Sequence, residues 1–145
     1  MKTWIHISIV LAIIVGPIVS KAQQANCKLF HTGKYRIIDT ANKSDILIDR
    51  NDSLETRMIY RQKQGSTKEV YEMQVVFKIK WISDCSYTAR LVKTIIPTPK
   101  GERSLPAEKK TLTVQILKSS NDAYLEKGTF DDKHHSSYKY VVYKL

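Results

Sequence analysis

Side chains that could bind a metal gather near the C-terminus, in Asp131-Asp132-Lys133-His134-His135. Carboxylate oxygens and imidazole nitrogens are common ligands of divalent metal ions. Adjacent residues on a strand point to opposite faces, however, so neighbouring histidines seldom bind the same ion. We therefore interpret this segment as a solvated polar hairpin turn, and we expect neither a metal nor a cofactor.

No pattern typical of nucleophilic catalysis occurs in the sequence. The G-x-S-x-G motif, which places a serine nucleophile on a sharp turn, is absent. His31 is a lone histidine among scattered serines and aspartates, and their spacing does not indicate a catalytic triad. The five glycines are isolated, so the chain has no glycine-rich phosphate loop. We predict that the protein has no catalytic residues and is not an enzyme.

The N-terminus has the pattern of a secretory signal peptide. Lys2 precedes an almost wholly apolar run over residues 4–19, and Ser20-Lys21-Ala22 places small residues at the cleavage positions. We predict a signal peptide over residues 1–22 and a single β domain over residues 23–145, exported to the periplasm or the extracellular space. An uncleaved membrane anchor is the alternative.

Two cysteines, Cys27 and Cys85, would meet an oxidising compartment after export. With two thiols only one intramolecular pairing exists, and it would close a loop of roughly 60 residues worth about 4 kcal/mol. Free thiols or a bridge between two chains stay open as alternatives.

The charge balance is basic, with 24 lysines and arginines against 14 acidic residues and a formal net charge of +10. Loss of Lys2 and Lys21 with the signal peptide would lower this charge to +8. Such a charge attracts polyanions at long range, although the cations are spread along the chain. Tyr138-Lys139-Tyr140 is typical of a stacking platform for single strands, but export makes us expect no nucleic-acid partner. Polysaccharides and acidic lipid headgroups remain as possible polyanionic partners.

The elements that must position these residues are strands. Between residues 71 and 82 apolar and mostly polar side chains alternate, which indicates a long half-buried strand. Its apolar face, a candidate ligand or core face, comprises Tyr71, Met73, Val75, Phe77, Ile79 and Trp81. Weaker patterns predict strands over residues 34–39, 45–50, 54–62, 87–96, 111–118, 123–130 and 138–144. Residues 97–106 hold three of the four prolines and Gly101, so we predict a loop there.

About seven or eight strands with short connections favour antiparallel pairing. We predict an all-β fold, a small up-and-down barrel of lipocalin-like type, with a two-sheet β-sandwich as the alternative. A barrel of about eight strands can enclose one small molecule.

Four blocks of residues carry a resemblance to a known family. They are Cys27 with Phe30; Thr32-Gly33-Lys34-Tyr35; Asp49-Arg50-Asn51-Asp52-Ser53 with Glu55; and Lys80-Trp81-Ile82-Ser83-Asp84-Cys85-Ser86-Tyr87. Over residues 27 to about 118 the chain resembles small secreted proteins of Bacteroidetes, of flavobacterial type, most of them uncharacterised.

Some of these proteins carry the label "DNA topoisomerase IV", which we judge wrong for this chain. That enzyme needs an ATP site, a metal-binding domain and a strand-cleaving tyrosine on a large scaffold. The shared residues suit structural roles instead: Gly33 permits a tight bend, and Trp81 would seal one end of the core.

Two short patterns, Asp39-Thr40-Ala41 and Asp52-Ser53-Leu54, are similar to the O-glycosylation site of Bacteroidetes. Thr40 and Ser53 are therefore candidate acceptors. Both fall at predicted turns, where attachment is sterically feasible.

Three functions compete. We rank first an exported, non-enzymatic protein of structural or interaction type, expected to be a monomer, that contacts an envelope protein or a polysaccharide. A lipocalin-like binding module for a small apolar ligand is the alternative, motivated by the apolar face of residues 71–81. An exported enzyme comes third.

Overall fold

The structure is a computed structural model, and it describes residues 26–107, 109–132 and 134–145. The predicted signal peptide and its cleavage after Ala22 lie outside the described residues, as does Lys133 of the polar turn.

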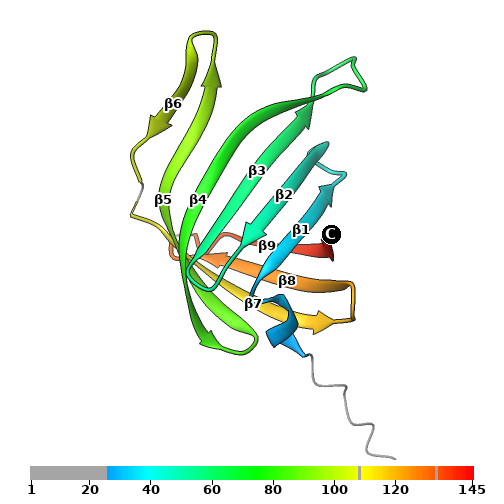
Figure 1. Cartoon of the computed structure of the whole chain (residues 1–145), viewed down its shortest axis with the longest axis vertical. Coiled ribbons are helices and arrows are strands. Elements are labelled where there is room, and N and C mark those ends of the chain that lie inside the picture. Colours follow the sequence, from blue (N-terminus) through cyan, green and yellow to red (C-terminus); the bar gives the residue numbers. More distant parts are fainter. Residues whose placement is uncertain (1–25, 108, 133) are drawn as a thin grey trace, which may run out of the picture.

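One short 3₁₀ turn and nine strands make up the described chain (Figure 1). They are η1 (Cys27–Phe30), β1 (Gly33–Asp39), β2 (Ser44–Arg50), β3 (Leu54–Gln62), β4 (Glu69–Ser83), β5 (Ser86–Thr98), β6 (Gly101–Leu105), β7 (Thr111–Ser119), β8 (Ala123–Phe130) and β9 (Ser137–Lys144). The alternation of apolar and polar residues correctly predicted the all-β fold.

Eight of these strands close into an antiparallel barrel. Each pairs with its neighbour in the order β4-β3-β2-β1-β9-β8-β7-β5, and the pairing of β4 with β5 closes the ring. β6 is the extra strand, and it forms a hairpin with the far half of β5 that rises beyond the barrel (Figure 1). The predicted barrel is confirmed, and the sandwich alternative is wrong.

The loop predicted over residues 97–106 is wrong in part. β5 runs on to Thr98 and β6 returns from Gly101, so a turn at Pro99-Lys100 joins two strands. Pro97 is tolerated in β5 because the pairing of β5 with β4 ends at Ile95, so no ladder bond to β4 is lost at the proline. Gly101 has φ +123°, a conformation that side chains disfavour.

A packed core fills the lower half of the barrel, at the η1 end in Figure 1. Phe30 of η1 enters this core with Tyr35 and Tyr124, its ring centroid 4.8 Å from that of Tyr124. Burial of such aromatic side chains dominates the energetics of small cores. A second buried cluster around Tyr87 and Leu112 continues the core along β4, β5 and β7.

The predicted disulfide between Cys27 and Cys85 is confirmed. It joins η1 to the turn between β4 and β5, and its cysteines are 58 residues apart in sequence. The bridge therefore holds η1 against the end of the barrel. No helix in the described part of the chain combines the length and the apolar character needed to cross a membrane.

Candidate functional site

The apolar face predicted on β4 divides into a buried and a half-exposed part. Ile79 is buried, and Phe77 and Trp81 pack against the core clusters. Phe77 and Trp81 are half-buried, as are Val75 and Met73 further along the same face, but neither core cluster includes Val75 or Met73. Solvent therefore reaches the inner wall of the barrel along the far half of β4.

Tyr71 leaves this inner face because the ladder shifts by one residue. Met73 pairs with Ile59 of β3, but Tyr71 pairs with Tyr60, so Glu72 is the extra residue of a bulge. Tyr60 and Ile59 are consecutive on β3 and point to opposite faces. The rings of Tyr60 and Tyr71 lie 5.7 Å apart, away from the inner wall.

Below the half-exposed wall, four charged side chains lie inside the barrel. They are Arg50, Glu55, Arg57 and Glu126, and we call them the charge quartet. Arg50 Nε donates to Glu55 Oε2 at 2.6 Å, and Arg57 Nε donates to Glu55 Oε1 at 2.6 Å. Arg57 Nη2 reaches across the barrel to Glu126 Oε1 at 3.3 Å. Two positive and two negative charges thus balance within the interior, as burial of ions requires.

Three tyrosines complete the quartet. Arg50 Nη2 donates to the hydroxyls of Tyr87 and Tyr124, both at 2.9 Å. The Tyr87 hydroxyl in turn donates to Glu55 at 2.8 Å, and the Tyr138 hydroxyl donates to Glu126 at 3.2 Å. Arg50 also stands 4.9 Å from the ring centroid of Tyr87, which adds a cation–π contact.

Burial and neighbouring charges set the pKa values of Glu55 and of the tyrosines around it. Burial alone would raise the pKa of Glu55, but the attraction of Arg50 and Arg57 outweighs burial and lowers that pKa to about 2. Burial raises the pKa of Tyr87 and of Tyr124 well above the usual value, so both phenols stay protonated. Near neutral pH Glu55 is therefore ionised, and Tyr87 and Tyr124 keep their protons.

Sequence analysis missed the quartet, although a signal for it existed. On β2, Arg50 lies two residues after Ile48, so its side chain points to the same inner face. On β3, Glu55 and Arg57 are separated from Ile59 by even numbers of residues and also point inward.

The polar segment near the C-terminus forms a turn whose carboxylates bind backbone groups. Asp132 Oδ1 accepts hydrogen bonds from the backbone N–H of His134 and Ser136, at 3.1 and 3.0 Å. Asp131 Oδ1 accepts one from the backbone of Thr111 at 2.8 Å. Within the described ranges no group of three His, Cys, Asp or Glu side chains is arranged to hold a metal ion.

His31 lies at the disulfide end of the barrel. Its ring stacks on Trp81 with centroids 3.5 Å apart, and its Nε2 is 2.9 Å from the carbonyl oxygen of Asp84. These contacts fix the imidazole as part of the packing around η1.

The two candidate glycosylation positions are exposed on turns at opposite ends of β2. Thr40 lies between β1 and β2, and Ser53 lies between β2 and β3. Their modification stays a prediction.

Fold and site together define a small antiparallel barrel with a charged, tyrosine-lined interior. Neither the protein-family models nor the curated proteins compared with this chain contain a match to it.

Proposed function

We propose that the protein is an exported, non-enzymatic binding module that holds a small apolar ligand against the inner wall of β4. The observation that carries this proposal is a difference in packing along one face of β4. Ile79 belongs to a core cluster and Phe77 packs against it, whereas Val75 and Met73 are not among the residues of either cluster. Ile79 is 4% exposed, whereas Val75 and Met73 on the same face are half-buried. An apolar wall that faces inward and yet remains accessible is typical of ligand sites in barrels.

The floor of the proposed site is polar and rigid. Arg57 lies 5.9 Å from the ring centroid of Phe77, and its donors already bind Glu55, Glu126 and Tyr138. A ligand would therefore contact the apolar wall and rest on a neutral floor, without displacing a bound charge. This supports an apolar ligand over a charged one.

The same geometry supports a binding role over an enzymatic one. The buried carboxylate of Glu55 is engaged by two arginines and a tyrosine, so it has no free lone pair aimed at the half-exposed wall. The disulfide is consistent with an oxidising compartment, and we propose the periplasm or the extracellular space as its location.

This order differs from the ranking that the sequence favoured, in which a structural or interaction role came first. The half-exposed wall changes the order because a filled barrel would have packed Val75 and Met73 against the core, as it packs Phe77 and Ile79.

A dansyl-labelled fatty acid tests the proposal. We expect saturable binding of about one probe per chain, with a rise in dansyl fluorescence. Val75→Lys places a charge on the wall and should abolish the rise. The matched control is Gln74→Lys, which adds the same charge on the opposite face of the same strand and should bind like the parent protein. Equal binding by the Val75→Lys variant, or no saturable binding by the parent, would contradict the proposal.

A further inference from the structure

The outer surface of β4 and β5 carries four cations close together. Lys78 and Lys80 alternate with inward residues on β4. On β5, Arg90 and Lys93 both lie on the outer face because the β4–β5 ladder shifts by one residue between them. We call these four side chains the basic face. Lys78 pairs directly with Arg90 in the ladder, and Lys93 pairs with Val76, two residues from Lys78 on β4. Cross-strand partners have Cβ atoms about 5 Å apart, so like charges face each other here.

In the described part of the chain, none of the four side chains has an ion-pair partner. Some cations elsewhere on the barrel have one: Arg36 binds Asp45, and Arg61 binds Glu72 at 3.1 Å. Like charges also face each other at Lys127 and Lys139 across β8 and β9, but the basic face gathers four cations rather than two.

Aliphatic side chains are exposed among these cations. Leu54, which pairs with Lys78, is 42% exposed, and Val92 is 44% exposed. Ile82, two residues beyond Lys80, is 62% exposed. Aliphatic side chains beside lysines are typical of surfaces that insert into the headgroup region of a membrane. Bases and sugars are instead recognised by aromatic stacking, and these neighbours of the cations offer none.

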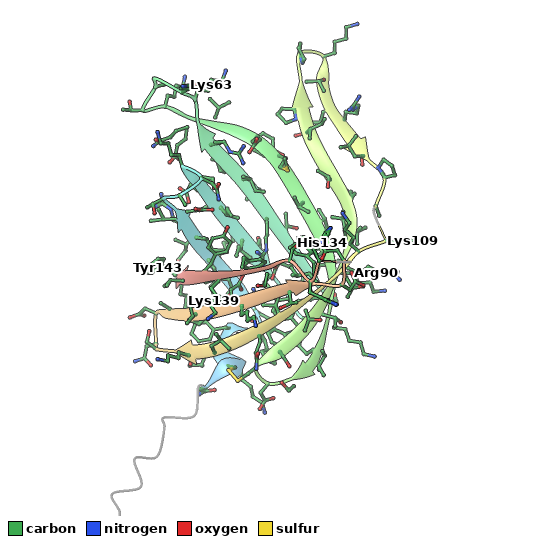
Figure 2. All side chains as sticks on the ribbon, turned by 180° about the vertical axis from the view of Figure 1, so that it is seen from behind. Lys63, Arg90, Lys109, His134, Lys139 and Tyr143 are labelled. Atoms are coloured by element: carbon green, nitrogen blue, oxygen red, sulfur yellow. A yellow bond between two sulfur atoms is a disulfide. The ribbon has the colours of Figure 1, made fainter. Side chains whose placement is uncertain are left out.

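A surface hollow of about 620 Å³ adjoins the basic face where β5 parts from β7. Arg90, Lys109 and Thr111 provide its polar lining, and Leu91, Val92 and Ala107 provide its apolar lining. Figure 2 shows Arg90 and Lys109 on the same side of the molecule, at the base of the β5–β6 hairpin. Cations beside aliphatic side chains suit a phosphate group that is attached to an acyl chain.

We propose that the basic face docks the protein on a membrane surface rich in anionic phospholipids, with one headgroup phosphate in the hollow between Arg90 and Lys109. The four cations face the phosphates, and Leu54, Val92 and Ile82 reach into the headgroup layer. This inference does not depend on the ligand site inside the barrel.

Co-sedimentation with phospholipid vesicles tests the docking. All variants are purified after expression of the full-length sequence, so they share the same N-terminus. The parent protein should bind vesicles that contain phosphatidylglycerol, and it should bind pure phosphatidylcholine vesicles far more weakly. Each cation near an anionic surface contributes a factor of roughly five to affinity. Lys78→Gln/Arg90→Gln should therefore weaken binding about thirty-fold.

The matched control is Lys127→Gln/Lys139→Gln. These two lysines also face each other across neighbouring strands, β8 and β9, so the control removes the same charge from another side of the barrel. It should lose only a few-fold in affinity. If the Lys78→Gln/Arg90→Gln protein does not fold, as judged by circular dichroism, Lys80→Gln/Lys93→Gln replaces it.

Two results would overturn the proposal. One is an equal loss of binding in both double variants, which would mean attraction by net charge alone. The other is binding of a soluble sulfated polysaccharide, heparin, by a parent protein that does not bind the anionic vesicles. A several-fold loss on Val92→Ser, with vesicle binding of the parent intact, would support insertion of the aliphatic side chains.

Discussion

Charged side chains inside the barrel have partners of opposite charge, whereas in the described chain the cations of the basic face on β4 and β5 do not. In the interior, Arg50 and Arg57 are matched by Glu55 and Glu126 within a single hydrogen-bonded quartet. On the basic face, four cations stand without an acidic partner in the described chain.

The difference separates two uses of a charged side chain. Buried ions must be compensated within the fold, because water cannot solvate them. Exposed cations that face each other lower stability slightly and are stabilised only when an anion arrives from outside. The quartet therefore belongs to folding and the basic face to recognition, and four substitutions examine this division.

Arg50→Met should have the largest effect. It leaves Glu55 buried with one of its two arginines missing and removes the donors that hold Tyr87 and Tyr124. Loss of one partner of a buried ion pair costs about 3–5 kcal/mol. Urea unfolding measures the change, with Arg61→Met, at the more exposed pair with Glu72, as the control expected to lose less than about 1 kcal/mol. Similar losses in both variants would remove the distinction between inner and outer arginines.

Low pH should lower the stability of the fold by protonating Glu55 of the same quartet. The pKa of Glu55 is about 2 in the folded protein against 4.5 ordinarily, so its contribution is full above pH 4.5 and is lost as pH falls through 2. A shift of this size corresponds to about 3 kcal/mol. In Glu55→Gln, unfolding free energy should change much less between pH 4.5 and 2 than in the parent. An unchanged slope in the variant would show that other carboxyl groups cause the acid sensitivity.

Gly128→Ala should disturb the quartet through its tyrosine. A Cβ at Gly128 would lie 2.2 Å from the ring of Tyr138, its partner across the β8–β9 ladder. The ring must move, and the hydrogen bonds from Tyr138 to Glu126 and from Arg57 to Tyr138 weaken. We expect a loss of about 1–3 kcal/mol in unfolding free energy. Thr129→Ala, one residue along on the outer face, should change stability by less than half as much; an equal change would argue against the contact.

Most of the fold could be predicted from the sequence, because alternation is a local property of each strand. The ranges predicted for β3 and β8 match the observed strands, and the ends predicted for the other expected strands differ by at most two residues. The shift at Glu72 could not be foreseen, since it depends on how β3 and β4 align. The sequence did not predict Pro97 within a strand for a related reason. The proline is tolerated because β5 no longer pairs with β4 at this position, and this depends on the folded sheet.

The candidate site was less predictable than the fold. Arg57 and Glu126 are 69 residues apart and meet only when β3 and β8 form opposite walls of a closed barrel. The alternation of side chains along each strand could predict that each charged residue points inward. It could not show that the positive and negative side chains would meet. The basic face has the same origin, because Lys78 and Arg90 become neighbours only through the β4–β5 register.

Lys78→Glu examines the division between folding and recognition in one variant, although its effect on stability is the smallest of the four. It turns a repulsive cross-strand pair with Arg90 into an attractive one, so at low salt the unfolding free energy should rise by about 0.2–1 kcal/mol. Binding to phosphatidylglycerol vesicles should fall at the same time. A variant that is more stable but binds less is the result we predict. A variant that loses stability, or that binds these vesicles as well as the parent, would contradict the account.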